Sequence, residues 1–187
     1  MKEEIRLIGW DDTSLPDQAG TEMTLVGVIT RGGKRMEGLV TTTILSDGLN
    51  ATSQIAQAIR ESKHKDQLQA ILLDGITYGG FNVVDIQKLH EATSLPVIAV
   101  IKGKPDFKSF RDAMRNLSDF GKRWKAVKMA GSPERLTISS HPESEVFFQK
   151  AGIDTQQAKE LLLVSITNGV IPEPLRLAHL IATGLSR

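Results

Sequence analysis

Two short runs made only of apolar residues constrain the fold of this 187-residue chain most strongly. They are residues 70–73 and residues 96–101, the second of which opens with a proline. Strands of this kind are buried on both faces, as in the centre of a parallel sheet. A helical pattern over about residues 83–92, with Asn82 as its N-cap, separates the two runs. The segment therefore predicts a strand–helix–strand unit with a right-handed crossover.

The N-terminal part of the chain predicts an antiparallel meander of three strands. The strands are expected at residues 5–10, 23–30 and 36–45, and a glycine turn joins the last two at hairpin spacing. A helix then follows to about Lys63, with Asn50 as its N-cap. Three antiparallel strands, a helix, and then alternating strands and helices is the order of the RNase H-like fold. We therefore predict an α/β fold with a mixed sheet flanked by helices.

The C-terminal half predicts mostly helices. Between Asp106 and Trp124, apolar residues recur at three- and four-residue steps, which indicates one amphipathic helix. The other expected elements are short strands at residues 126–129, 135–138 and 146–148, a helix from about 154 to 168, and a last helix from Pro174 to Gly184.

Composition excludes several classes of protein. With 40% hydrophobic and 24% charged residues, the chain is ordinary for a soluble globular protein, and we expect one domain over residues 1–187. No run is long and apolar enough to span a bilayer, and the first residues lack the apolar core of a signal peptide, so we expect no membrane partner. The absence of cysteine excludes disulfides and thiolate metal sites, and it agrees with a cytoplasmic location.

Basic residues are concentrated in one segment. The formal net charge is +1, yet residues 102–128 contain nine Lys or Arg and three Asp, while the rest of the chain is net acidic. The segment is either a solvated helix face or a track for the phosphates of nucleic acid. Trp124 is then either a stacking platform or a core residue. The candidate nucleic-acid-binding residues are Lys104, Lys108, Arg111, Arg115, Lys122 and Arg123.

Two carboxylates follow predicted strands and form the candidate site. Asp74 ends the run at residues 70–73 and precedes the glycine-rich stretch 75–80, and Asp11 ends the first strand. If the two strands are neighbours, about 4.8 Å apart, both carboxylates can share one divalent cation such as Mg²⁺. Asp12 would point to the opposite face, although at a strand end it could still reach the ion. The alternative is that these acids only form solvated turns.

Several segments resemble a known family. Residues 71–75, the helix after them and residues 95–102, which end in Lys102, are similar to the core of endonuclease V. The sequence 168–178, with its Pro-Glu-Pro junction, resembles the C-terminal helix pair of that family, and Gly9-Trp10-Asp11 its Gly-x-Asp. The stretch Asp47–Thr52 is typical of an uncharacterised branch of the same RNase H-like superfamily, known as domain of unknown function ninety-nine. The resemblance covers nearly the whole chain.

The resemblance implies metal-dependent cleavage of phosphodiester bonds in nucleic acid, with Mg²⁺ or Mn²⁺ as the cofactor. It assigns catalytic positions to Asp11, Asp47, Asp74 and Lys102. The metal ligands would be Asp11, Asp74 and Asp47, with Asp12 as an additional candidate. From the residues alone, Asp47 can equally be part of an Asp-Gly turn and Lys102 a surface lysine.

Two features of the family are not found in this sequence. The histidine that precedes the penultimate helix in endonuclease V falls near Gly152, and His141 is the candidate to replace it. His64 and His90 are expected at the surface, and His179 lies in the last predicted helix. The Pro-Tyr-Ile-Pro wedge that reads the base also has no equivalent.

Three functions therefore remain open at the level of sequence. The first is a metal-dependent nuclease acting on DNA or RNA. The second, favoured by the missing histidine, is a nucleic-acid-binding protein that has lost catalysis. The third is a binding module in which residues 75–80 cradle an anion. Only the first two predict an affinity for nucleic acid that falls steeply with salt.

Overall fold

The computed structural model of the protein describes residues 4–14 and 18–186. The strands are β1 (Arg6–Asp12), β2 (Glu22–Arg31), β3 (Arg35–Leu45), β4 (Ala70–Asp74), β5 (Thr77–Tyr78), β6 (Asn82–Val83), β7 (Val97–Lys102), β8 (Glu134–Leu136) and β9 (Val146–Ala151). The helices are α1 (Ala51–Glu61), α2 (Ile86–Thr93), α3 (Phe107–Met114), α4 (Phe120–Met129), α5 (Thr155–Ser165) and α6 (Glu173–Leu185), with a short 3₁₀ helix η1 (Lys65–Gln67).

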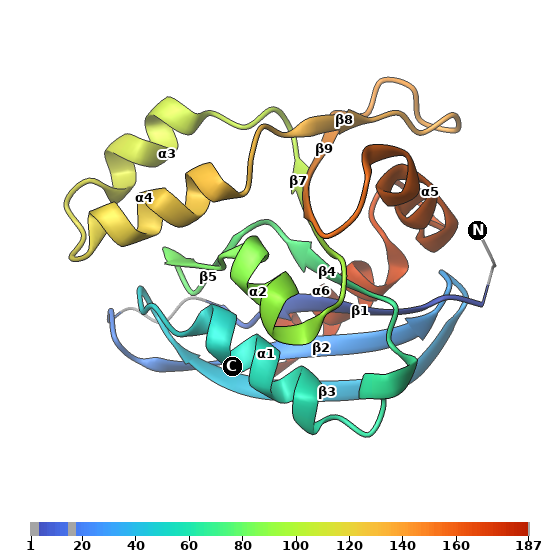
Figure 1. Cartoon of the computed structure of the whole chain (residues 1–187), viewed down its shortest axis with the longest axis horizontal. Helices are drawn as coiled ribbons and strands as arrows, with labels where there is room; N and C mark the ends of the chain where they lie inside the picture. Colours follow the sequence, from blue (N-terminus) through green and yellow to red (C-terminus); the bar gives the residue numbers. More distant parts are fainter. Residues whose placement is uncertain (1–3, 15–17, 187) are drawn as a thin grey trace.

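A mixed sheet of seven strands organises the described residues, in the order β3-β2-β1-β4-β7-β9-β8 (Figure 1). β1 pairs antiparallel with β2 and parallel with β4, and β4 pairs parallel with β7. The three antiparallel strands followed by parallel strands agree with the prediction. The two apolar runs form β4 and β7 at the centre of this sheet, because only a strand covered on both faces can be apolar at every position.

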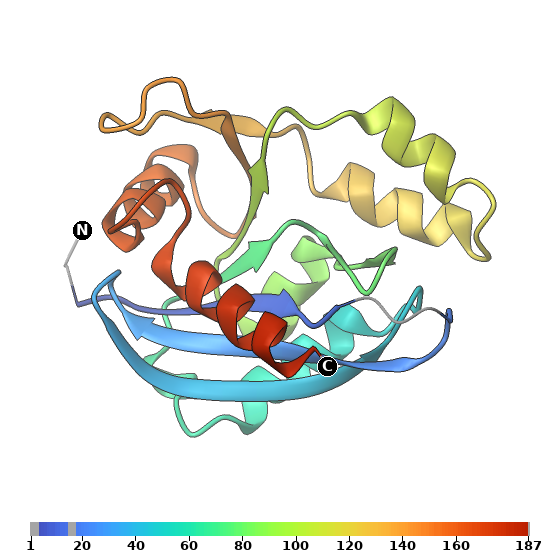
Figure 2. The ribbon, with the colours of Figure 1, turned by 180° about the vertical axis from the view of Figure 1, so that it is seen from behind.

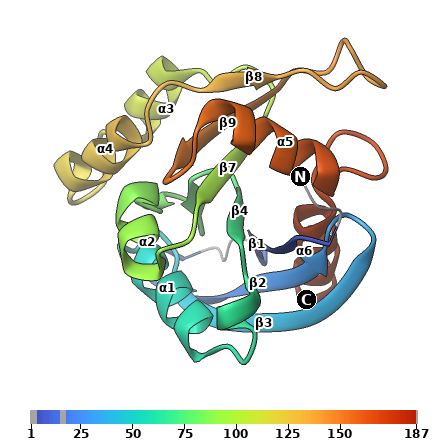
Figure 3. The same cartoon turned by 45° about the vertical axis from the view of Figure 1, so that its right-hand side comes forward.

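Helices cover both faces of the sheet. Alternate residues of the central strands contribute to two hydrophobic clusters, since neighbouring side chains of a strand point to opposite faces. Ile8 and Leu73 belong to the cluster packed against α1 and α2, whereas Leu7 and Leu72 belong to the cluster packed against α5. Figure 3 shows α1 and α2 on one side of the sheet and α5 and α6 on the other.

The glycine-rich stretch after β4 contains a small hairpin that the sequence pattern does not reveal. β5 pairs with β6, through Thr77 with Val83 and Tyr78 with Asn82. Asn82 is fully buried, and its Oδ1 accepts a hydrogen bond from Ala51 N at 3.0 Å. Asn82 therefore satisfies the first turn of α1, while the side chain of Asn50, at the N-cap position, makes no capping bond. The predicted cap of α2 is also different, because Asp85 caps that helix by accepting from Lys88 N.

The predicted helix over residues 106–124 is wrong as one element. It is divided into α3 and α4 by a turn in which Asp119 has a left-handed backbone conformation, with φ of 58°. The apolar stripe is shared between the two helices, since Phe110 and Trp124 both pack against the same hydrophobic core. The strand expected at residues 126–129 lies inside α4, where Ala126 and Val127 are buried as part of a helix face.

No helix within residues 4–14 and 18–186 is long and apolar enough to cross a membrane.

Candidate metal centre

The carboxylates of Asp11 and Asp74 lie on the same face of the sheet. β1 and β4 are parallel neighbours, and their last paired residues are Trp10 and Leu73. Asp11 lies an even number of residues from Leu7, and Asp74 lies an even number from Leu72. Since alternate residues of a strand share a face, both acids point to the face covered by α5 and α6. The two acids therefore lie close together at the C-terminal ends of the parallel strands β1 and β4.

His179 of α6 joins these two acids. One donor atom each from Asp11, Asp74 and His179 lies within 4.8 Å of the other two. The imidazole Nδ1 of His179 is 2.8 Å from Asp11 Oδ2. The histidine side chain is 60% exposed, whereas Asp11 is only 6% exposed. Two carboxylates and an imidazole are a donor set for a divalent metal, and they face solvent on one side.

Gly9 explains how α6 comes close enough to supply this histidine. A Cβ atom at Gly9 would lie 2.6 Å from the backbone of Pro174, so only glycine allows this helix to rest on β1. Leu175 lies over Gly9, and His179 follows one helical turn later, about 6 Å along the axis. Asp11 is two residues beyond Gly9, about 6.6 Å along the strand. The two rises match, so His179 reaches Asp11. Figure 2 shows α6, in red, lying across β1 and β2.

Lys102 is close to the acids, as the sequence predicts. It ends β7, the parallel neighbour of β4, and its Nζ is 3.3 Å from Asp74 Oδ2. The lysine side chain is 52% exposed and that of Asp74 is 20% exposed. A half-exposed ammonium group beside a carboxylate of this cluster can also contact a phosphate that approaches from solvent.

The electrostatics of the cluster favour a cation. Burial raises the pKa of Asp11 above its usual value, and the nearby negative charge of Asp74 raises it further. The hydrogen bond from Asp12 N and the contact with His179 oppose this effect. A buried carboxylate close to a second one is destabilised in its charged form, and a divalent cation relieves both the burial and the repulsion.

Asp12 points away from this cluster. Its side chain lies on the opposite face of β1, and its Oδ2 accepts a hydrogen bond from Gly79 N in the β5–β6 hairpin. Burial raises its pKa to about 6, although the hydrogen bond from Gly79 lowers it. Among the described residues, the group that could hold a metal ion consists of Asp11, Asp74 and His179 and does not include Asp12. Asp12 instead holds the β5–β6 hairpin through its bond to Gly79 N.

Asp47 is also held by the hairpin and is outside the group formed by Asp11, Asp74 and His179. Its Oδ1 accepts from Phe81 N at 2.8 Å, and its backbone N donates to Gly79 O at 2.7 Å. It has a positive φ of 50°. These contacts fit the turn interpretation of the Asp-Gly pair, and they leave a ligand role for Asp47 without geometric support.

The histidine of the cluster is one that the sequence did not single out. Position 152 has no room for the expected histidine, because a Cβ on Gly152 would lie 2.2 Å from the His90 ring. His141, the candidate replacement, is paired with Ser140 and belongs to a loop beside α5. The distance from Gly9 to Asp11 along β1 equals the distance from Leu175 to His179 along α6. This equality could have pointed to His179, but only if α6 had been known to pack on β1.

The candidate nucleic-acid-binding residues of the basic segment 102–128 differ in exposure. Lys104, Lys108, Arg111, Arg115 and Lys122 are exposed in or beside α3 and α4. Trp124 is partly buried, stacks on Phe120, and lies under the guanidinium group of Arg111 at 5.6 Å. The core interpretation of Trp124 is therefore the one that the contacts support.

The prediction that Arg123 binds nucleic acid is wrong. It is 3% exposed, and its guanidinium group donates to the backbone oxygens of Ser118, Gly48, Phe81 and Asp47. A side chain whose donors are used in this way is not available to nucleic acid. It attaches α4 to the turn before α1 and to the hairpin.

A small cavity lies where β4 and β7 end, and its lining contains none of Asp11, Asp74 and His179. It has a volume of about 230 Å³ and is lined by Gly75 and Ile101, which adjoin Asp74 and Lys102 in the chain. Phe107 and Phe110 of α3 provide apolar walls, and the buried Gln149 provides a polar group. A larger cavity of about 650 Å³ lies between α1, α2 and α4, and its lining contains none of Asp11, Asp74 and His179.

Comparison with known proteins decides the family. The profile of the endonuclease dU family matches residues 3–186. The chain belongs to this family. A "UPF0215 protein" from Methanosarcina mazei is 43% identical over 186 residues, which cover 100% of this chain and 93% of that protein. A "UPF0215 protein" from Pyrococcus furiosus is 38% identical, over 100% of this chain and 95% of that protein.

Solved structures show the same fold. A protein of unknown function from Archaeoglobus fulgidus has a TM-score of 0.89 and 38% identity, and the match covers 98% of this chain and 99% of that one. Endonuclease V from Ciona intestinalis, in complex with DNA containing an inosine, has a TM-score of 0.61 and 14% identity, over 95% and 84% of the two chains. The endonuclease V-like fold predicted from the sequence is thereby confirmed for this member of the endonuclease dU family.

Proposed function

We propose that the protein is a metal-dependent endonuclease that hydrolyses phosphodiester bonds in DNA containing deoxyuridine. The convergence of Asp11, Asp74 and His179 within 4.8 Å carries the reaction type. The family description, endonuclease dU, suggests the substrate. The endonuclease V-like fold agrees with both, and the Ciona intestinalis protein of that fold is known in complex with DNA.

The carboxylates of Asp11 and Asp74 would hold Mg²⁺ or Mn²⁺, with His179 as the third donor. Such an ion polarises the phosphate and lowers the pKa of bound water. The mixture of oxygen and nitrogen donors suits Mn²⁺ as well as Mg²⁺. Lys102, half exposed beside Asp74, would orient the phosphate by contacting its oxygens.

The small cavity at the ends of β4 and β7 would receive the base. It has room for a single planar ring system, and Phe107 and Phe110 in its lining offer apolar surface to such a ring. The buried carboxamide of Gln149, whose Nε2 donates to Gly131 O at 2.6 Å, supplies polarity that a base can recognise. Gly75 and Ile101 adjoin Asp74 and Lys102 in the chain, so the cavity lies at the same end of β4 and β7 as these residues.

Two observations speak against the other two functions, an inactive nucleic-acid-binding protein and an anion-binding module. The inactive nucleic-acid-binding protein was favoured by a missing histidine, and His179, whose donor atom lies within 4.8 Å of both carboxylates, would fill that role. An anion cradle in residues 75–80 would need free backbone amides. In the structure Gly75 N donates to Val100 O and Gly79 N to Asp12 Oδ2.

Cleavage assays test the proposed function. Duplex and single-stranded oligonucleotides with one deoxyuridine, and the same sequences with thymidine, are incubated with Mg²⁺, with Mn²⁺ or with EDTA. We expect divalent-dependent cleavage near deoxyuridine that falls at least about 100-fold in Asp74→Asn. Cleavage in EDTA, or equal cleavage by the variant, would contradict the proposal. Salt-dependent binding without cleavage would favour the inactive binding protein.

A further inference from the structure

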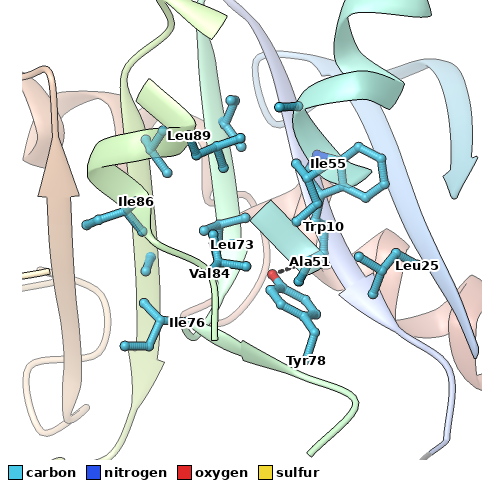
Figure 4. Packing of buried hydrophobic residues seen from close by; sticks show 14 of the residues in the cluster. Trp10, Leu25, Ala51, Ile55, Leu73, Ile76, Tyr78, Val84, Ile86 and Leu89 are labelled. Carbon is cyan, nitrogen blue, oxygen red and sulfur yellow. Dashed lines mark hydrogen bonds between the residues drawn. The ribbon is translucent and has the colours of Figure 1, made fainter. Parts of the chain in front are cut away.

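Tyr78 lies underneath the metal centre and has not been given a role so far. It is fully buried, and it is the single tyrosine of the chain. Its hydroxyl group donates to Trp10 O at 3.0 Å and accepts from Asp74 N at 3.1 Å (Figure 4 shows the bond to Trp10). One phenol oxygen thus connects the backbones of β1 and β4.

The place of this connection is specific. The paired residues of β1 and β4 end at Trp10 and Leu73, and the next residues are the two acids. The Tyr78 hydroxyl therefore joins the peptide group just before Asp11 to the peptide group of Asp74 itself. Beyond this point the ladder of paired residues no longer fixes the distance between the strands.

We propose that Tyr78 is a positioning residue, whose hydroxyl group sets the separation of the Asp11 and Asp74 carboxylates. The metal-binding part of this proposal rests on the proposed function. Tyr78 touches neither metal nor substrate, and it acts through the backbone that carries the two acids. Metal affinity depends on such supporting contacts, because ligands held at the wrong separation cannot share one ion.

The hairpin that carries Tyr78 is itself fixed at several points. Next to Tyr78, Gly79 N donates to Asp12 Oδ2, and Gly79 O accepts from Asp47 N. Phe81 N donates to Asp47 Oδ1. Asp12 and Asp47, which the structure leaves outside the group that could hold a metal ion, thereby hold the hairpin. The phenol cannot move away from the strand ends without breaking these bonds.

The test compares Tyr78→Phe, which removes one hydroxyl group, with Thr30→Val as a matched control. Thr30 is also fully buried, and its hydroxyl group donates to Gly32 O at 2.7 Å. It pairs with Leu7 at the end of β1 opposite to Asp11. Both variants lose one buried hydroxyl group: Tyr78→Phe loses two hydrogen bonds beside the acids, and Thr30→Val loses one at the opposite end of β1. Mn²⁺ affinity is measured by calorimetry on folded protein, well below the unfolding temperature of each variant.

We expect the affinity for Mn²⁺ to fall about tenfold or more in Tyr78→Phe and to stay within about twofold of the wild type in Thr30→Val. Equal Mn²⁺ affinity in Tyr78→Phe and wild type would overturn the proposal. If the wild type binds no Mn²⁺, the proposed function fails, and metal-free crystal structures decide the positioning role. A change of more than about 0.5 Å in the Asp11–Asp74 carboxylate separation of Tyr78→Phe would support it, and an unchanged separation would overturn it.

Discussion

Asp11 and Asp12 are neighbours in sequence, yet they belong to opposite faces of the sheet. Asp11 contacts His179 on one face, and Asp12 accepts a hydrogen bond from Gly79 on the other. The alternation of side chains along a strand explains the difference, which the sequence left open because a residue at a strand end could still reach the ion. The contact that Asp12 makes with the hairpin was not predictable, because the hairpin itself has no clear sequence pattern.

The raised pKa of Asp12 predicts how stability depends on pH. Its pKa is about 6 in the folded protein against a usual value of 3.8, so folding favours the protonated form. The resulting stabilisation is complete below about pH 4 and is lost as the pH rises through 6. Asp12→Asn keeps an oxygen acceptor for Gly79 N and cannot ionise. In EDTA we expect the variant to be more stable than the wild type by about 3 kcal/mol at pH 7, since one pKa unit corresponds to about 1.4 kcal/mol.

Urea denaturation of both proteins between pH 4 and pH 7.5 measures this difference in the free energy of unfolding. The two curves should converge at the acidic end and separate between pH 4 and 6. Curves that remain parallel over the whole range would show that Asp12 titrates in the folded protein as it does in the unfolded chain.

At the scale of elements, the packing of α6 on β1 determines whether the cluster has a histidine. Gly9→Ala places a methyl group 2.6 Å from Pro174 and must displace the helix. We expect it to lower Mn²⁺ affinity at least about tenfold and the free energy of unfolding by about 2 kcal/mol. Gly184→Ala, in α6 with no atom near its Cβ, is the control and should leave Mn²⁺ affinity unchanged.

Calorimetry with Mn²⁺ on the three proteins checks this expectation. Wild-type affinity in Gly9→Ala would mean that α6 can move without carrying His179 away from Asp11. The central claim about the origin of the histidine would then fail, even if the two acids still bound metal.

The elements show why sequence reasoning succeeded for β1 to β4 and for β7. Their apolar pattern is strong, and the ends of neighbouring strands lie at one sheet edge, which brought Asp11 and Asp74 together in the prediction, whereas Lys102 was added by the resemblance to endonuclease V. Sequence reasoning failed where contacts between distant parts of the chain override the local hydrophobic pattern. The turn at Asp119 interrupts a continuous stripe, Arg123 is drawn into the interior by four carbonyl groups, and His179 depends on the close approach at Gly9.

At the scale of the whole molecule, the exposed basic residues beside α3 should track the nucleic-acid backbone. Lys104→Gln combined with Lys108→Gln removes two exposed charges in the segment that leads from Lys102 into α3. For duplex DNA we expect the slope of log affinity against log salt concentration to decrease by about 1 to 2. Lys63→Gln with Lys65→Gln, exposed near η1, is the control for net charge and should leave the slope unchanged.

Fluorescence anisotropy with labelled DNA over a range of salt concentrations measures these slopes. Equal slopes for the two double variants would mean that nucleic acid does not approach along α3. The track would then have to lie on another surface of the molecule.

The most direct test of the metal centre is anomalous diffraction from crystals soaked in Mn²⁺. The geometry predicts a peak between the carboxylates of Asp11 and Asp74 and the imidazole of His179, and its loss in Asp74→Asn. Calorimetry counts bound ions, whereas the anomalous peak locates them on named side chains. A peak at other residues, or none at this cluster in a fully soaked crystal, would contradict the account of this protein as a metal-dependent endonuclease.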